Sequence, residues 1–353
     1  MKTRSDPIAS KDFPKLLRVS LGTAISLGLT SGKIQAFPTT AYLMTHNPSK
    51  CSANCSFCPQ ARDSHGSASM LSRVSWPIVQ TNAILEAINR DLETEHRIRR
   101  VCIQALNYKD VFDHVSFIVT KIRRQCGVPI SVSCQPSGSD ELCRLAEAGV
   151  QRVGIPLDAA TEGIFDRVKG YQAGGPYRWE RQFQLLKQAL GIFGEGNVST
   201  HLIVGLGETE QEMVKTVQDC VDIGVLPGLF AFTPVSGTKM QNAKQPPIQA
   251  YRRIQVARII VLSKSSRFEN MRFAQGQITD FGIGKDALER IVDGGEAFRT
   301  CGCPDCNRPY YNERPTGPIY NYPAKLKSEE LAETRNQICL DREYFLKDMQ
   351  DNQ

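Results

Sequence analysis

The sequence predicts an α/β protein of the (β/α)8 TIM-barrel type. Short runs of apolar and β-branched residues alternate with longer helical patterns, which is typical of parallel strands joined by crossover helices. Eight such runs can be counted in one chain of 353 residues, 41% of them hydrophobic, which is enough for one large core. A flat doubly wound sheet has the same alternation and is the structural alternative.

The elements follow in order along the chain. Strands are expected near Thr40–Thr45, Arg100–Leu106, Ile130–Cys134, Arg152–Leu157, Val198–Val204, Leu229–Phe232, Met271–Ala274 and Ala297–Cys301. Helices are expected at Ile78–His96, Val111–Gln125, Asp140–Ala148, Tyr177–Phe193, Glu210–Ile223 and Ile248–Ser263. The barrel would therefore occupy residues 37–306.

The two ends of the chain differ in character from this middle part. Residues 1–36 are expected to form a helical extension, because the apolar stretch Leu16–Leu29 fits an amphipathic helix packed across one end of the domain. Residues 307–353 form a tail rich in Pro, Tyr and Asn, which either caps the barrel mouth or packs outside it. A polar helix is expected from Ser328 onward.

Composition excludes several classes of protein. The net charge of +6 is spread along the chain, with local clusters such as Arg97, Arg99 and Arg100, so no nucleic-acid partner is expected. No apolar run is long enough to span a bilayer, so no membrane is expected. Twelve cysteines are too sparse for a disulfide scaffold, and their short spacings indicate metal binding in a reducing, cytoplasmic compartment.

The first cysteine motif is Cys51-Ser-Ala-Asn-Cys55-Ser-Phe-Cys58, directly after the first expected strand. Three thiolates in one short loop suit an iron–sulfur cluster and leave one iron open, since such clusters usually have four cysteine ligands. A zinc site is the alternative, with His46 or His65 as a further ligand.

This spacing, and the run Cys55-Ser-Phe-Cys58-Pro-Gln-Ala, resemble the radical S-adenosylmethionine (SAM) superfamily and, within it, biotin synthase. The similarity extends from about Tyr42 to Cys301. It implies a [4Fe-4S] cluster on Cys51, Cys55 and Cys58 whose unique iron chelates SAM. One-electron reduction would then release a 5′-deoxyadenosyl radical, so no catalytic residue beyond the cluster ligands is expected.

The same resemblance implies residues that bind SAM. Gly205, Gly207 and Glu208 lie in the run His201-Leu-Ile-Val-Gly205-Leu-Gly207-Glu208-Thr209, which is similar to the family's motif beside the SAM adenine. Taken alone, its glycines fit an ordinary tight turn. Asp158 matches the ribose-binding carboxylate, although it would also suit a helix N-cap. Phe57 would lie near the adenine or pack in the core.

A second motif, Cys301-Gly-Cys303-Pro-Asp-Cys306, is expected at the same end of the barrel as Cys51–Cys58. Cys102 and Cys134 match positions that hold the [2Fe-2S] cluster of biotin synthase, and Arg272 matches its arginine ligand. The family's third cysteine is Ser199 here. We therefore expect Cys102, Cys134, Cys303 and Cys306 to bind an auxiliary [4Fe-4S] cluster, with Cys301 as a substitute for one of them.

The second motif also has a zinc alternative, and the remaining cysteines have no expected metal role. A zinc knuckle would suit Cys303 and Cys306, but no histidine follows Cys306 to complete it. Cys126, Cys143, Cys220 and Cys339 are expected to be ordinary thiols, because they fall in or at the ends of expected helices.

A biotin synthase-like chain with a [4Fe-4S] auxiliary cluster resembles a component of the two-protein lipoyl synthase systems. The implied activity is sulfur insertion into an octanoyl chain on a lipoyl-domain protein or carrier. The implied partners are that acylated protein, a second radical SAM protein and an electron donor such as ferredoxin or flavodoxin. Biotin synthase, a radical SAM enzyme with an electron-relay cluster, and a non-catalytic iron–sulfur or zinc scaffold are the alternatives.

Overall fold

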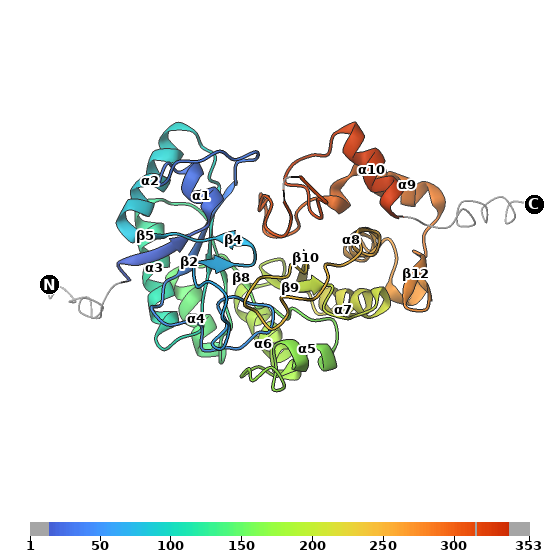
Figure 1. Ribbon diagram of the computed structural model, residues 1–353, viewed down its shortest axis with the longest axis horizontal. Coiled ribbons are helices and arrows are strands. Elements are labelled where there is room, and N and C mark those ends of the chain that lie inside the picture. The colour runs from blue at the N-terminus through green and yellow to red at the C-terminus, as the bar shows by residue number, and fades with distance from the viewer. Residues whose placement is uncertain (1–13, 315, 339–353) are drawn as a thin grey trace, which may run out of the picture.

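The computed structural model describes residues 14–314 and 316–338, which fold around one curved, largely parallel sheet (Figure 1). Its strand order is β10-β9-β8-β7-β6-β2-β1-β5. The six strands from β2 to β10 pair in parallel, and they comprise β2 (Thr40–Thr45), β6 (Arg100–Gln104), β7 (Ile130–Ser133), β8 (Arg152–Gly154), β9 (Val198–Val204) and β10 (Leu226–Ala231). All six were expected from the sequence, with small shifts at their ends.

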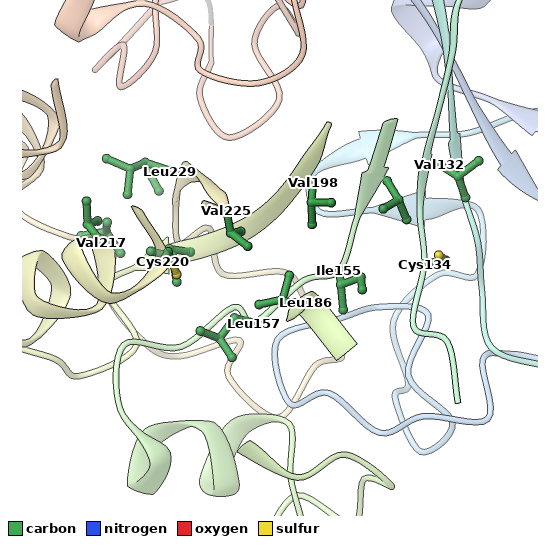
Figure 2. Packing of buried hydrophobic residues seen from close by; sticks show 14 of the residues in the cluster. Val132, Cys134, Ile155, Leu157, Leu186, Val198, Val217, Cys220, Val225 and Leu229 are labelled. Atoms are coloured by element: carbon green, nitrogen blue, oxygen red, sulfur yellow. The ribbon is translucent and has the colours of Figure 1, made fainter. Parts of the chain in front are cut away.

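Helices connect these strands and cover the outer face of the sheet (Figure 1). They are α2 (Thr81–Thr94), α3 (Val111–Gln125), α4 (Ser139–Ala148), α5 (Glu162–Val168), α6 (Trp179–Phe193), α7 (Glu210–Asp222) and α8 (Ile248–Leu262). In α3, the buried Val111, Val115, Ile118 and Ile122 recur at helical spacing, so one face of the helix is apolar and packs inward. Figure 2 shows Leu186 of α6 in the same layer as Ile155 and Val198.

The predicted closed barrel of eight strands is wrong, because the sheet ends at β10 and β5 rather than closing on itself. The seventh expected strand, Met271–Ala274, contributes β11 (Arg272–Ala274), which forms a separate hairpin with β12 (Gln277–Asp280). The eighth, Ala297–Cys301, overlaps the 3-10 turn Glu296–Phe298 and takes part in one isolated bridge, Arg299 to Tyr322. Another 3-10 turn, Phe268–Asn270, precedes the hairpin.

The expected helix at Leu16–Leu29 is also wrong. Leu16–Val19 forms β1, which is antiparallel to β2 and to β5 (Ile78–Gln80), and only Leu21–Ser26 is helical as α1. The described part of residues 1–36 therefore extends the main sheet. A small hairpin of β3 (Met70–Leu71) and β4 (Val74–Ser75) lies between β2 and β5 in the chain.

The C-terminal part adds α9 (Lys285–Gly294) and α10 (Ser328–Ile338), the second of which begins where the polar helix was expected. Arg252 of α8 fastens this part: it donates to the carbonyl oxygens of Ile319 and Tyr320 and to the side chain of Gln337. Cys339, residues 1–13 of the expected extension, and residues 315 and 339–353 of the tail lie outside the described residues. Among the described helices, none is both long and apolar enough to cross a bilayer.

Candidate functional site

Cys51, Cys55 and Cys58 lie in the loop after β2 and line one pocket, which we call the triad pocket. Backbone hydrogen bonds fix the loop at both sides of Cys51: its amide donates to Gln60 (3.0 Å), and the amide of Ser52 donates to Asn107 (2.8 Å). The amide of Asn107 also donates to the Cys51 sulfur at 3.2 Å. The sequence therefore brings the three thiols to the same site, as their spacing predicted.

Lys50 holds the same loop from within. Its ammonium group donates to three backbone carbonyl oxygens, those of Pro59 (3.0 Å), Ser64 (2.5 Å) and Gly66 (2.7 Å). Three carbonyl acceptors use all three N–H donors of the ammonium group. Lys50, which precedes Cys51, therefore holds the segment from Pro59 to Gly66, which follows Cys58.

Asp158 and Lys169 form a buried ion pair in the triad pocket, with 2.6 Å between the Lys169 Nζ and the Asp158 Oδ2. Lys169 also donates to the carbonyl oxygen of Pro156 and lies 5.2 Å from the ring centre of Tyr177. Asp158 adopts a left-handed backbone (φ 70°), and Thr161 rather than Asp158 caps α5. The N-cap alternative for Asp158 is therefore wrong, whereas its role at the SAM ribose stays a prediction.

The other residues expected to bind SAM lie in two places. Phe57 lines the triad pocket. Gly205, Gly207 and Glu208 form the turn after β9 and are not among the residues that line this pocket. The Glu208 carboxylate accepts from the amides of Gly205 (2.6 Å) and Leu206 (2.9 Å), so it stabilises its own turn. A contact of this turn with SAM stays a prediction.

Cys102, Cys301, Cys303 and Cys306 line a second pocket, which we call the four-cysteine pocket. Two residues of the expected auxiliary set are wrongly placed. Cys134 lines the triad pocket instead, because it lies one residue beyond the end of β7. Arg272 lies in the β11–β12 hairpin with 73% of its side chain exposed. Cys301, expected only as a substitute, completes the four thiols.

Each sulfur of the four-cysteine pocket has a hydrogen-bonding partner. Gln104 donates to Cys102 (3.2 Å), and the amide of Leu229 donates to Cys301 (3.0 Å). The hydroxyl of Ser131 lies 3.1 Å from the Cys303 sulfur, and that of Tyr42 lies 3.2 Å from the Cys306 sulfur. Hydrogen-bond donors around metal-bound thiolates are the usual outer layer of such sites.

Strand register explains how these partners meet. Tyr42, Cys102 and Ser131 are direct neighbours across β2, β6 and β7, so their side chains form one row on the inner face of the sheet. The next row toward the carboxyl ends of the strands contains Met44, Gln104 and Ser133, which line the triad pocket. The four-cysteine pocket thus lies one row deeper than the triad pocket.

A shared wall separates the two pockets. Its residues line both of them, and they are Gln104, His201, Phe230 and Tyr311. The His201 ring lies 4.7 Å from that of Phe230, and the Phe230 ring meets Tyr311 edge-on at 6.1 Å. Burial, with smaller contributions from the charges of Arg308 and Lys169, lowers the pKa of His201 to about 3.

The family that this sequence matches is the radical SAM superfamily, over residues 48–220, a range that contains the whole triad motif. The chain belongs to the radical SAM superfamily. Radical SAM enzymes use a [4Fe-4S] cluster and SAM, so this family implies both cofactors here. That Cys51, Cys55 and Cys58 bind them in the triad pocket stays a prediction. The biotin synthase and lipoyl synthase resemblances are not part of this match.

Solved structures similar to this radical SAM protein are distant. They include methylornithine synthase (11% identity, TM-score 0.48, covering 61% of this chain and 59% of that one). The FeFe-hydrogenase maturase HydG from Carboxydothermus hydrogenoformans shares 15% identity (TM-score 0.49, covering 64% and 52%). A radical SAM methyltransferase from Sphaerobacter thermophilus shares 13% (TM-score 0.46, covering 69% and 71%). The chain thus spans little more than half the length of the first two, and no curated protein matches it.

Neither cysteine set is arranged as a site for a single metal ion in the described residues. Among the described residues, no three Cys, His, Asp or Glu side chains converge closely enough to hold one metal ion. A tetrahedral zinc site requires all its sulfurs within about 2.3 Å of one point. In a four-iron cluster each thiolate binds its own iron, so the sulfurs stand farther apart.

Burial affects the protonation of the triad thiols. Burial raises the pKa of the Cys51 and Cys55 thiols and raises that of Cys58 to about 12. Amide donors from Ala53 and Asn107 offset this effect in part at Cys51. The thiols are therefore neutral near pH 7 until a metal replaces their protons, which couples cluster binding to proton release.

Sequence reasoning missed several residues at these sites. Lys169 carries no spacing signal that links it to Asp158, and Arg308 and Tyr42 become part of the site only through tertiary contacts. The row of Tyr42, Cys102 and Ser131 could have been found from strand alternation once the sheet order was known, because each lies at an inward position of its strand.

Proposed function

We propose that this radical SAM enzyme inserts sulfur into an unactivated C–H bond of a protein-bound octanoyl chain, with an auxiliary cluster in the four-cysteine pocket as the sulfur donor. One observation carries the proposal. Four thiols, each with a hydrogen-bonding partner, line a pocket that shares a wall with the triad pocket.

The electron count of the reaction explains why the two pockets must adjoin. The 5′-deoxyadenosyl radical takes a hydrogen atom from the alkyl chain and becomes 5′-deoxyadenosine. The resulting carbon radical would supply one electron and a cluster sulfide two, so the C–S bond would use two and the third would pass to the irons. A carbon radical reacts with whatever it meets first, so the sulfide has to be the nearest partner.

The ligand set of this auxiliary [4Fe-4S] cluster is revised from the sequence-based prediction. Cys102, Cys301, Cys303 and Cys306 replace the set that contained Cys134. The [2Fe-2S] set of biotin synthase has no support, because its counterparts are dispersed. Cys102 and Ser199 line the four-cysteine pocket, whereas Cys134 and Arg272 lie elsewhere.

An octanoyl substrate is supported by the lining of the triad pocket. Apolar side chains dominate it, including those of Met44, Leu71, Leu106 and Ile203, and an alkyl chain would bury its surface against them. The acyl carrier is proposed to be a lipoyl-domain protein. A second radical SAM protein and an electron donor such as ferredoxin or flavodoxin complete the proposed system.

The test combines cluster analysis with a mass measurement. Reconstituted protein should hold about eight iron and eight sulfide per chain, as two four-iron clusters require. With SAM, reductant and an octanoylated lipoyl-domain peptide, it should form 5′-deoxyadenosine and add sulfur to the peptide.

The decisive variant is Cys303→Ala/Cys306→Ala, with the exposed Cys143→Ala as its matched control. The double variant should lose about half of its iron, keep reductive SAM cleavage and add no sulfur, whereas the control should match the unchanged protein. Unchanged iron content in the double variant would contradict the proposed ligand set. An absence of sulfur in the peptide while both clusters are present would reject sulfur insertion.

The second candidate is a radical SAM enzyme whose auxiliary cluster relays electrons. Complete ligation by four thiolates favours it, because a closed cluster exchanges electrons without exchanging ligands. Sulfide content after turnover separates the two candidates: a donor cluster loses sulfide in proportion to the product, whereas a relay cluster keeps it.

A further inference from the structure

Arg308 is placed at the boundary between the shared wall and the four-cysteine pocket. Its guanidinium carbon lies 3.7 Å from the centre of the Phe230 ring and 5.7 Å from that of Tyr311. One of its terminal nitrogens donates to the carbonyl oxygen of Cys301 at 3.4 Å. The Arg308 amide donates to the Tyr42 hydroxyl, which in turn contacts the Cys306 sulfur. Arg308 therefore contacts the surroundings of two of the four thiols.

No carboxylate pairs with this guanidinium among the described residues. The buried carboxylate of Glu313 is close enough to interact electrostatically, but its two oxygens accept from the amides of Asn312 (2.7 Å) and Asn321 (2.8 Å). The other arginine that lines the pocket, Arg258, donates to the carbonyl oxygen of Pro227. Burying a charged guanidinium between aromatic rings and thiols costs free energy unless an anion offsets its charge.

The pocket itself offers the anion. Four thiolates contribute four negative charges, and an oxidised [4Fe-4S] core contributes two positive ones, so a four-thiolate cluster is a dianion. A positive charge beside such a cluster stabilises the reduced form more than the oxidised form, because the reduced form carries one more negative charge. Its effect is large where water is excluded.

We propose that Arg308 is the counter-charge of the auxiliary cluster and raises its reduction potential from the side that faces the shared wall. This inference rests on the proposed function, since it requires a cluster in the four-cysteine pocket. Arg308 is a positioning residue: it touches neither SAM nor the alkyl chain in this assignment. Its stacking on Phe230 fixes the guanidinium on the side of the pocket nearest to the triad pocket.

This position matters for the reaction proposed above. When the C–S bond forms, one electron passes to the irons of the auxiliary cluster, and a nearby positive charge favours that transfer. The same contact orders Phe230 and Tyr311, so one side chain links the charge of the cluster to the wall that the carbon radical must face.

The experiment is a redox titration of the reconstituted full-length protein, followed by electron paramagnetic resonance. Arg308→Gln removes the charge, and Arg308→Lys keeps the charge without the planar fork. Arg267→Gln is the control, because Arg267 is exposed, pairs with Asp222 and Glu269, and lines neither pocket. Iron and sulfide content are measured for every variant.

We expect the auxiliary cluster of Arg308→Gln to be reduced at a more negative potential than that of the unchanged protein. Arg308→Lys should lie between the two, and the triad cluster should keep its potential in all of them. Selective loss of the second cluster from the glutamine variant, with retention in the lysine variant, would also support a charge role.

Two results would overturn the inference, and they are distinguishable. The role of Arg308 alone would be overturned by an unchanged potential of the auxiliary cluster in Arg308→Gln with both clusters present. Loss of the auxiliary cluster from both Arg308 variants would overturn it in the same way. A single cluster in the unchanged protein would overturn the proposed function and this inference together.

Discussion

Lys169 and His201 are two ionisable side chains that line the triad pocket, and the cost of burying their charge is avoided in different ways. Lys169 is 2% exposed and forms an ion pair with Asp158, which is itself 11% exposed. The His201 ring is tilted against that of Phe230, and the side chain is neutral because burial holds its pKa far below the usual range. Each arrangement makes a separate prediction about stability.

Replacing Lys169 with Met is expected to destabilise the protein by about 3 kcal/mol, because the Asp158 carboxylate loses its partner in a buried site. Asp158→Asn combined with Lys169→Met should recover most of this loss, since a neutral amide needs no counter-charge and asparagine tolerates the left-handed backbone at 158. Urea unfolding of the single and double variants measures both effects. Additive losses in the double variant would contradict a direct pairing.

His201 predicts a pH dependence of stability. Its pKa is about 3 when folded and 6.5 as the reference value, so below about pH 6.5 the unfolded chain gains a proton that the folded chain does not. Stability is therefore lost as the pH falls. Between about pH 8 and about pH 5.5, wild type should lose about 1 kcal/mol more than His201→Gln. Equal pH profiles in urea unfolding would show that His201 is protonated in the folded state.

At the scale of elements, the cluster loop depends on a single side chain. Lys50→Met removes three hydrogen bonds to the carbonyls of Pro59, Ser64 and Gly66 and leaves those acceptors partly buried without their donor. We expect the triad cluster to load less iron, with the four-cysteine site unaffected. Iron content and the electron paramagnetic resonance signal of each cluster measure this, and exposed Lys33→Met is the control.

The tail depends in the same way on Arg252. Arg252→Met leaves the carbonyls of Ile319 and Tyr320 without their donor in a buried position, so it should destabilise the attachment of the tail to α8 by about 3 kcal/mol. The segment from Cys301 onward should become more sensitive to protease and should hold less of the second cluster. Arg299→Gln, which removes only an exposed pair with Glu296, is the matched control.

The sequence predicted the six parallel strands because each lies in a short stretch rich in apolar and β-branched residues, as in Val198–Val204. The prediction from sequence failed where a run was too short to indicate which strand it pairs with. Met271–Ala274 pairs with its own neighbour in a hairpin, and Leu16–Val19 is a strand because β2 offers it an edge. Such pairings depend on tertiary contacts rather than on local periodicity.

The candidate site divides in the same manner. The grouping of the triad in one pocket was predictable because its three cysteines share one loop and their spacing is local. The choice between Cys134 and Cys301 was not, because it depends on where β7 ends and on which side chains face inward. Ser131, two residues before the end of β7, reaches Cys303, whereas Cys134 follows the strand and faces the triad pocket.

At the scale of the whole molecule, the sheet is open, and both pockets lie on its inner face, where loop and C-terminal residues cover them. Cluster binding should therefore stabilise two separate segments, the loop from Asn47 to Gly66 and the segment from Cys301 to Leu326. Hydrogen exchange measured with and without clusters should differ mainly in these segments and little in the buried strands β6 to β9. Uniform loosening of the sheet on iron removal would contradict this division.

The separation of the four thiols along the chain has a consequence in time. Cys102 belongs to β6, whereas Cys301, Cys303 and Cys306 are synthesised much later than this strand. The triad loop and its sheet are complete much earlier. Under the proposed assignment, the triad loop is synthesised before the second cluster site is complete, so we expect iron delivered during synthesis to reach the triad first.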